Sequence, residues 1–453
     1  MAGRETIRYP RAMTAWLKSL STRPVTVALL IGLAAELLFA VRIGWPTHLF
    51  FDEVHYVPAA QNLLDLSEPR NIEHPLLGKE LIALGMAIFG DDPYGWRLVP
   101  SLFGSATVVA GFAFVWLLTR RMRPAVIAAL LLVLNQLLFI QARIAMLDVF
   151  LVAFLCWAMV LLLRAMHGPA KQVLWRWIAG SALLGLAVAV KWAAVPYVAF
   201  AGMAFIVLRI GEHWEVSPRG FGDSFAKALG AALAAKDHRR WPGLPTIRAL
   251  LIMAAVSIPL YFLTFLPAFF YERDPMTLAR LIPFQGEMYA LQTQVLAHHT
   301  YQSDWWSWPL MIRPIWYFYE LDDGAQRGVL LIGNPAIMWG GLVAVLACFW
   351  AGLRDGAAKP LAMALLWTAS VAIFIVIPKS LGFYYYYYPS AIFLCFALAL
   401  AFDHYEAGHR RYWAEWFLAV SFLLFLYFYP ILSSMPLSDT MAFEKWTWFN
   451  SWR

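Results

Sequence analysis

Charged residues are scarce in this chain of 453 residues. Asp, Glu, Lys and Arg make up 14% of the sequence, whereas 61% is hydrophobic and 16% is aromatic. Several apolar runs reach the roughly 20 residues that cross a bilayer as a helix, which argues against a soluble domain. The strands of a membrane barrel would alternate apolar and polar residues over about 10 positions, and these runs do not alternate. The composition therefore predicts an all-α integral membrane protein.

Cysteine is also rare, and its placement excludes a disulfide framework. Cys156, Cys348 and Cys395 all lie inside apolar runs, so we expect small core residues and no zinc ligands. No small-residue cleavage site follows the first apolar run, which we expect to remain as a signal anchor. Neither a repeat of 20–50 residues nor an appended soluble domain is evident. Function is therefore expected in the membrane helices and the segments that join them.

The net charge of +7 is explained by membrane topology without a nucleic-acid partner. Basic loops such as "TRRMRP" and "RAMHGPAKQVLWR" recur on one side of the predicted spans, as the positive-inside rule requires for a cytoplasmic N-terminus. About eleven transmembrane helices are predicted, at residues 24–45, 96–118, 125–141, 146–164, 177–191, 193–209, 248–268, 332–353, 360–378, 388–403 and 414–432.

These spans form a single polytopic membrane domain, residues 1–453. A cytoplasmic N-terminal segment, 1–23, precedes them, and a basic cytoplasmic loop, 210–247, is expected to be a solvated connector. Amphipathic stretches such as "LLGKELIALGMAIFG" predict interfacial helices on the outer face. The outer face is predicted to hold a first outer segment (46–95), a second outer segment (269–331) and a C-terminal tail (433–453).

Two adjacent carboxylates, Asp52 and Glu53, follow the first span in "THLFFDEVHYVPAA". Carboxylates at such a point are often solvated loop charges. Their apolar flanks favour a position at the lip of a cavity instead. A carboxylate there can act as the general base for a hydroxyl nucleophile.

Three cations are predicted on the same face at headgroup depth: Lys79, Arg143 and Lys191. Each has a structural alternative, because Lys79 can snorkel, Lys191 can anchor the interface, and Arg143 can pair with Asp148 to fix a helical hairpin. Together they suit a lipid-linked phosphate whose departure they would stabilise.

The second outer segment places polar groups among aromatic rings in "HHTYQSDWWSWPLMIRPIWYFYE". Rings beside polar groups can hold a sugar or a peptide, and they can equally cap a helix bundle. A run of five tyrosines, in "GFYYYYYPS", offers further phenol groups. The candidate acceptor- or sugar-binding residues are His74, Asp148, His299, Tyr301, Trp305, Arg313 and Tyr386.

These motifs together resemble those of the protein O-mannosyltransferase family, of the GT-C class of glycosyltransferases. "FFDEVHY" resembles the family's Asp-Glu signature, and "HPLLGK" its His-Pro-Pro-Leu-Gly-Lys signature with Leu76 in place of a proline. "ARIAMLDVF" is similar to the Arg and Leu-Asp pattern of the family. "HTYQSDWWSWPL" resembles His-Pro-Tyr-x-Ser-x-Trp-x-x-Trp-Pro-Leu, with Thr300 in place of proline.

The resemblance implies a GT-C fold and inverting transfer of mannose from a polyprenyl-phosphate donor to Ser or Thr of an exported protein. Asp52 would be the base and Glu53 a positioning group, and Arg143, helped by Lys191, would bind the donor phosphate. The family needs no nucleotide sugar at the active site. No metal is clearly required, and a divalent cation near Asp52 and Glu53 is left open.

The second outer segment is too short for the β-trefoil insert of eukaryotic members, which points to a bacterial-type enzyme. Such an enzyme would lie in the bacterial inner membrane with its active site facing outward. Tyr386 stands at the position where the family has a histidine. This difference concerns which donor sugar or which acceptor the enzyme uses. An aminoarabinose-transferase-like enzyme that modifies lipid is the alternative function, and a transporter is a distant one. Oligomeric state is not readable.

Overall fold

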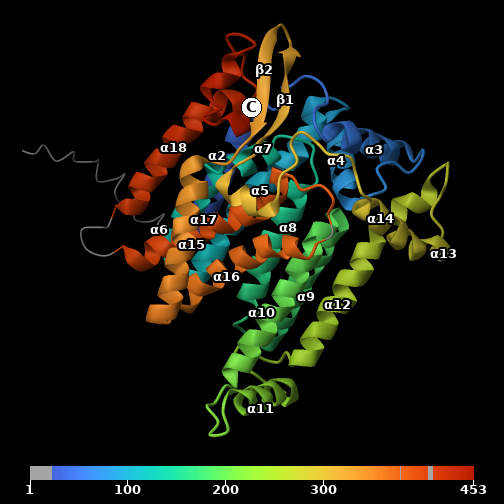
Figure 1. The fold of residues 1–453 in the computed structure, drawn as a ribbon. Coiled ribbons are helices and arrows are strands. Elements are labelled where there is room, and N and C mark those ends of the chain that lie inside the picture. The colour runs from blue at the N-terminus through green and yellow to red at the C-terminus, as the bar shows by residue number, and fades with distance from the viewer. Residues whose placement is uncertain (1–22, 378, 407–411) are drawn as a thin grey trace, which may run out of the picture.

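The computed structural model describes residues 23–377, 379–406 and 412–453, and it is predominantly helical (Figure 1). A single two-stranded antiparallel hairpin projects from one end of the helical bundle. The main elements are α2 (Pro24–Ala40), α3 (Glu53–Asp65), α4 (Leu77–Phe89), α5 (Pro93–Thr119), α6 (Met122–Val133), α7 (Gln136–Gln141), α8 (Asp148–Arg164), α9 (Ala170–Val190), α10 (Val195–Glu212), α11 (Phe221–Ala234), α12 (Thr246–Leu263), α13 (Leu278–Leu281), α14 (Pro283–Thr293), β1 (Ile315–Asp322), β2 (Ala325–Leu331), α15 (Pro335–Asp355), α16 (Ala358–Ala372), α17 (Tyr388–Tyr405) and α18 (Trp413–Leu432).

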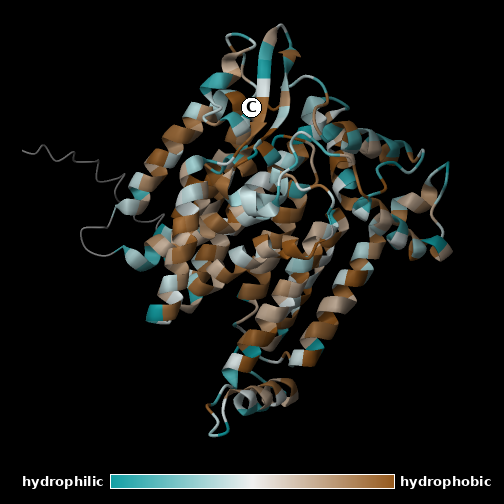
Figure 2. Ribbon diagram, viewed as in Figure 1, coloured by the Kyte–Doolittle hydropathy of each residue, from teal (hydrophilic) through white to brown (hydrophobic). Residues whose placement is uncertain are grey.

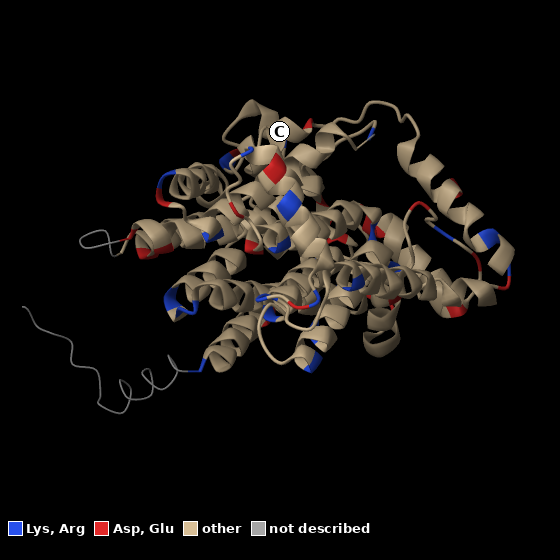
Figure 3. Cartoon of the chain, turned by 90° about the horizontal axis from the view of Figure 1, so that it is seen from below, with Lys and Arg blue, Asp and Glu red and all other residues tan. Residues whose placement is uncertain are grey.

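Each predicted span contains at least one of these helices. Among the described residues, eight helices are long and apolar enough to cross a membrane, and α2, α6 and α8 are shorter. The predicted span 125–141 is interrupted at Asn135, whose side-chain oxygen accepts hydrogen bonds from the N–H groups of Leu137 and Leu138 and so caps α7. Seen from below, charged residues mark helix ends and loops of a mostly uncharged bundle (Figure 3). The protein is a multi-span integral membrane protein.

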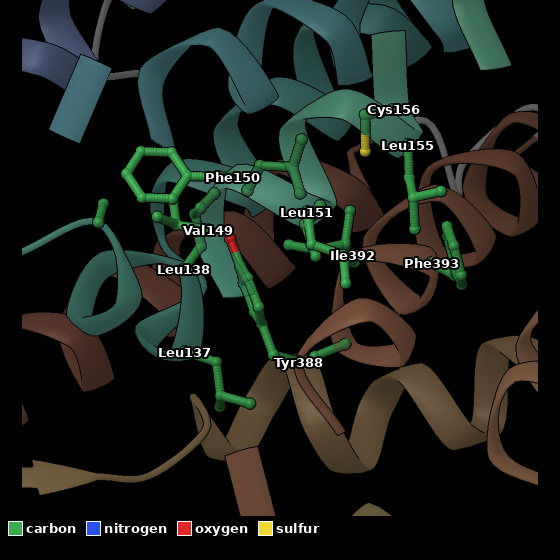
Figure 4. Packing of buried hydrophobic residues seen from close by; sticks show 14 of the residues in the cluster. Leu137, Leu138, Val149, Phe150, Leu151, Leu155, Cys156, Tyr388, Ile392 and Phe393 are labelled. Atoms are coloured by element: carbon green, nitrogen blue, oxygen red, sulfur yellow. The ribbon is translucent and has the colours of Figure 1, made fainter. Parts of the chain in front are cut away.

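Helix α17 occupies the centre of the bundle. Its residues from Tyr388 to Ala401 are all buried, as expected for a helix that is apolar on every side. Close packing against α7 and α8 brings Tyr388 and Ile392 beside Val149 and Leu151 (Figure 4). The three cysteines are free and buried, as the sequence predicts.

The end of the bundle that carries the hairpin is built from amphipathic and irregular segments. The predicted interfacial helices are present as α3 and α4. The hairpin formed by β1 and β2 was not predicted, because the sequence indicated an all-α fold. Asp322 fixes it by accepting hydrogen bonds from the backbone N–H and the hydroxyl of Thr47, in the connection that follows α2.

The C-terminal tail, 433–453, is packed against this hairpin. Leu437 pairs with Gln326 of β2, and the indole of Trp452 is buried and donates to the carbonyl of Met311 at 2.7 Å. The guanidinium of Arg313 donates to the carbonyls of Ser451 and Arg453. The tail is therefore part of the folded layer around the hairpin.

The opposite end of the bundle carries α11, which lies across the ends of α10 and α12 (Figure 1). This helix falls in the loop that the sequence marks as a solvated connector. One face, with Ala228 and Ala232, packs in a small cluster with Ile210, whereas Phe221 is 75% exposed. Hydrophilic residues gather at this end and at the hairpin end, with apolar helices between them (Figure 2).

Candidate active site

Asp52 lies at the N-terminus of α3, after the connection of residues 41–51 that follows α2. The preceding residue, Phe51, adopts a left-handed φ of 51° and its ring stacks on Tyr317 at 3.8 Å between centroids. A non-glycine residue in this region is held by its surroundings and is common at functional sites. Burial raises the pKa of Asp52 to about 6, against the opposing influence of Lys191 and of hydrogen bonding with Tyr56.

Glu53 fixes the first turn of α3. Its carboxylate forms a bidentate ion pair with Arg97 of α5, at 2.8 Å for each contact, and both side chains are fully buried. The backbone N–H of Ala145 donates to the same carboxylate at 2.9 Å. Both carboxylate oxygens are therefore engaged by neighbouring groups.

Lys191 and Asp148 form a buried ion pair beside Asp52. The ammonium nitrogen lies 2.9 and 3.1 Å from the two carboxylate oxygens, and each side chain is 5% exposed. The rings of Tyr385 and Tyr386 lie 5.2 and 5.6 Å from the same nitrogen. Lys191 thus presents its charge between a carboxylate and two aromatic faces.

Three lysines surround His74. Burial and the positive charges of Lys191, Lys79 and Lys379 lower the pKa of His74 well below its ordinary value, so the imidazole is neutral. Its Nδ1 atom is buried with no hydrogen-bond partner among the described residues. Burial and the nearby Lys191 also lower the pKa of Lys379 to about 8. This region therefore favours an anion.

A cavity of about 270 Å³ is lined by two of these lysines, Lys191 and Lys379. Its polar wall includes Lys191, Lys379 and Tyr386, and its other wall is formed by apolar side chains such as Val195 and Phe374. His74 lines a second cavity of about 300 Å³ on the other side, together with arginines of the outer segments. An apolar cleft that ends in two ammonium groups suits a lipid phosphate.

The structure does not favour the predicted role of Arg143 as a ligand of the donor phosphate. Its guanidinium donates to the carbonyls of Phe39, Val41 and Arg42, where α2 ends. The side chain is 6% exposed, so it caps the negative end of α2 and has no open face for an anion. The suggested pairing of Arg143 with Asp148 is also wrong, because Lys191 takes that place.

Lys79 is likewise directed inward. Its ammonium group donates to the carbonyls of Asn71 at 2.7 Å and His74 at 2.9 Å, and the side chain is fully buried. Burial lowers the pKa of Lys79 to about 7. Lys79 is therefore neither a snorkelling residue nor a direct phosphate ligand, and it holds the turn that presents His74.

The aromatic motif of the second outer segment forms a rim above the tyrosine run. Ser303 donates its backbone N–H to the carbonyl of Gly382 at 2.9 Å, and the ring of His299 packs edge-on against Phe383. Tyr301 lies under the guanidinium of Arg313, which also donates to Thr300. Of the candidates in this segment, Trp305 is partly buried in the core, and none is placed beside Asp52 by a direct contact.

The carboxylates of Asp52 and Glu53 do not form a shared cation site. Glu53 is neutralised by Arg97, and Asp148 is neutralised by Lys191. Among Asp52, Glu53 and Asp148, Asp52 is the carboxylate without an ion pair. A divalent cation would therefore find a single available carboxylate ligand in this group of residues. The donor set thus does not fit a bound metal ion.

Several residues of the site are not among those predicted from the sequence. Tyr56 follows Asp52 by one helical turn, a spacing that does bring side chains together. Lys379 precedes the tyrosine run and Tyr385 belongs to it, and their proximity to Lys191 arises only in the tertiary fold. Arg97 carried no local signal, because its partner Glu53 is 44 residues away.

The chain matches two family models. Residues 90–217 match "Dolichyl-phosphate-mannose-protein mannosyltransferase", and residues 277–359 match "C-terminal four TMM region of protein-O-mannosyltransferase". A curated relative, the polyprenol-phosphate-mannose–protein mannosyltransferase of Mycolicibacterium smegmatis (strain MKD8), is 26% identical over 94% of this chain and 92% of its own length.

Solved structures share the fold. The S. cerevisiae protein O-mannosyltransferase Pmt1-Pmt2 complex bound to the sugar donor has a TM-score of 0.74, with 14% identity, over 94% of this chain and 92% of that chain. ArnT from Cupriavidus metallidurans bound to undecaprenyl phosphate has a TM-score of 0.53, with 15% identity, over 95% of this chain and 78% of that chain.

The chain shares the GT-C glycosyltransferase fold of these solved structures. The two family models match residues 90–217 and 277–359, and they confirm the resemblance to the protein O-mannosyltransferase family that was found in the sequence.

Proposed function

We propose that this protein transfers mannose from a polyprenyl-phosphate donor to Ser or Thr hydroxyls of exported proteins, with inversion at the sugar carbon. The observation that carries the proposal is the position of Asp52 beside Lys191, which lines an apolar cavity together with Lys379. The names of the curated relatives supply the donor class and the protein acceptor. The undecaprenyl phosphate bound to ArnT supports a polyprenyl phosphate as the lipid.

In the proposed reaction Asp52 accepts the proton of the acceptor hydroxyl as its oxygen bonds to C1 of the sugar. The bond between C1 and the phosphate oxygen breaks at the same time, and the lipid phosphate leaves. Lys191 and Lys379 stabilise the charge that develops on this leaving group. A raised pKa suits Asp52 to this task, because a general base works best when its pKa lies near the operating pH.

The roles of the other candidates follow from their contacts. Glu53 positions Asp52, and Lys79 and Arg143 support the fold around the site. Tyr386 stacks beside both lysines, where its hydroxyl can orient the donor. The acceptor is proposed to approach through the cavity that His74 lines, with His299, Tyr301, Trp305 and Arg313 as further candidate contacts.

The proposed setting is a bacterial inner membrane, with the N-terminus cytoplasmic and the hairpin end outside. The single membrane domain 1–453 would hold donor and acceptor sites in its outer layer. This orientation places the site where exported polypeptides emerge, and it agrees with the distribution of basic loops. No observation favours transport, and a lipid acceptor remains an outcome of the test below.

The proposal is tested by incubating purified protein with labelled polyprenyl-phosphate mannose and either a Thr-rich peptide or lipid A. We expect label on the peptide. Label on lipid A alone would favour the lipid-modifying alternative. In cells, mass spectrometry of exported proteins should detect hexose on Ser or Thr only when the gene is intact.

A further inference from the structure

A cluster of two histidines and a glutamate lies at the end of the bundle opposite the hairpin. Glu212 and His213 end α10, and His238 belongs to the connection between α11 and α12. One ligand atom from each residue lies within 4.8 Å of the others. Neither the family resemblance nor the proposed reaction makes use of these residues.

The spacing of the ligand atoms suits a tetrahedral metal site. Nε2 of His213 lies 3.3 Å from Nδ1 of His238, and the latter lies 3.7 Å from Oε2 of Glu212. Two ligands held about 2.0–2.1 Å from a tetrahedral ion are roughly 3.3–3.4 Å apart. The two imidazoles meet this separation at 3.3 Å, and the 3.7 Å between His238 and Glu212 is slightly longer.

One ligand atom of the cluster lacks a hydrogen-bond partner. Oε2 of Glu212 is buried and accepts no hydrogen bond from the described residues, and Nδ1 of His238 and the guanidinium of Arg209 each lie 3.7 Å from it. The other oxygen of Glu212 already accepts the backbone N–H of Arg240 at 2.9 Å. This bond orients the carboxylate and leaves Oε2 toward the imidazole of His238.

The backbone around the cluster is held rigidly. Arg209 donates to the carbonyls of Arg240 and Leu244, which ties the end of α10 to the approach to α12. Asp237 accepts the backbone N–H groups of His238 and Gly243, each at 2.9 Å. A site held in this way needs little reorganisation on binding an ion. The guanidinium of Arg209 also forms an ion pair with Glu212 at 3.7 Å, and Asp237 adds a negative charge beside His238.

We propose that Glu212, His213 and His238 bind a divalent transition-metal ion, with zinc as the best match to two imidazoles and a carboxylate. Imidazole and carboxylate ligands suit zinc, and three protein ligands leave a fourth position for water. The ion would join the end of α10 to the connection before α12. The ion would take no part in the proposed transfer, because Asp52 lies at the other end of the bundle.

The test uses full-length protein purified in detergent through a tag without histidines, stripped of metal and titrated with zinc alone against a chromophoric chelator. We expect one zinc per chain and a higher melting temperature with zinc than without it. His213→Ala and His238→Ala should each weaken zinc binding by more than the roughly 10-fold that loss of an outer-shell partner costs. His213→Cys should retain zinc, because a thiolate is also a zinc ligand.

His404→Ala is the matched control. His404 also contacts a carboxylate, that of Asp355 at 2.9 Å, but these two side chains have no third ligand in the described part of the chain. This variant should bind zinc as the wild type does. The proposal is overturned if wild-type protein binds no zinc, or if His213→Ala and His404→Ala bind it equally well.

Discussion

Lys191 and Asp148 form a buried ion pair that joins the end of α9 to the start of α8, with 2.9 Å between the ammonium nitrogen and the nearer oxygen. The pair sits beside Asp52 and acts on it in opposite senses. Lys191 lowers the pKa of Asp52, whereas Asp148 raises it. Burial has the largest effect on the pKa of Asp52, and the two members of this ion pair adjust it in opposite directions.

The transfer rate should depend on the protonation of Asp52. Its pKa is raised to about 6 by burial, so the carboxylate is protonated and unable to accept a proton below that pH. We expect the rate to fall as the pH decreases through about 6 and to be level above it. The measurement is kcat/KM from pH 4.5 to 8 on protein that stays folded. A rate that is constant down to pH 5 would rule out this base.

Substitutions in the ion pair of Lys191 and Asp148 should shift the fall in transfer rate at low pH, here called the acid limb, in opposite directions. Lys191→Met removes a positive charge and should shift the limb to higher pH, because the pKa of Asp52 then rises. Asp148→Asn removes a negative charge and should shift it to lower pH. The pH profiles of both variants give the answer, with Asp65→Asn at the exposed end of α3 as control. Shifts of the same sign would contradict the arrangement.

Arg143 is predicted to matter for stability. Arg143→Ala removes donors from three carbonyls at the end of α2, and we expect a lower melting temperature with the KM for the donor unchanged. Thermal unfolding and donor titration on the same preparation separate the two effects. Arg120→Ala, at the exposed C-terminal end of α5, is the control and should leave both quantities unchanged. A large rise in KM at wild-type stability would restore Arg143 as a donor ligand.

Glu53 should also act through the fold. Glu53→Gln leaves the buried guanidinium of Arg97 without its counter-charge, and breaking such a pair costs about 3–5 kcal/mol in free energy of unfolding. The matched control is Glu68→Gln, whose partner Arg273 is 3.5 Å away on the surface. An exposed pair contributes only about 0–1 kcal/mol. Unfolding in graded denaturant measures both, and equal losses would contradict the assigned role.

Much of the site was predictable because its motifs are local. Asp52 and Glu53 lie in a short motif after the first apolar run, and the sequence alone indicated Asp52 and Lys191 on the same face as candidates for base and phosphate ligand. The partners of charges were not predictable, because contacts such as Arg143 with the carbonyls at residues 39–42 join segments about a hundred residues apart. Spacing along the chain suggested Asp148 instead, which is closer in sequence but already paired.

In the fold, too, features carried by one segment were predictable, whereas contacts between distant segments were not. Apolar runs long enough to span a membrane identified the helices, since that signal lies within each segment. The hairpin was missed because its aromatic residues, from Ile315 to Leu331, also fit an interfacial segment. Its strands are fixed by contacts such as that between Asp322 and Thr47, which no local pattern contains.

Asp52→Asn tests the central claim most directly, with donor binding and transfer measured on the same preparation. The amide keeps the shape of the side chain but cannot take the proton, so we predict that transfer falls by about 10²–10⁴-fold while the donor binds as in the wild type. Transfer within a few-fold of the wild-type rate, with the donor bound equally well, would contradict the assignment of Asp52 as the base.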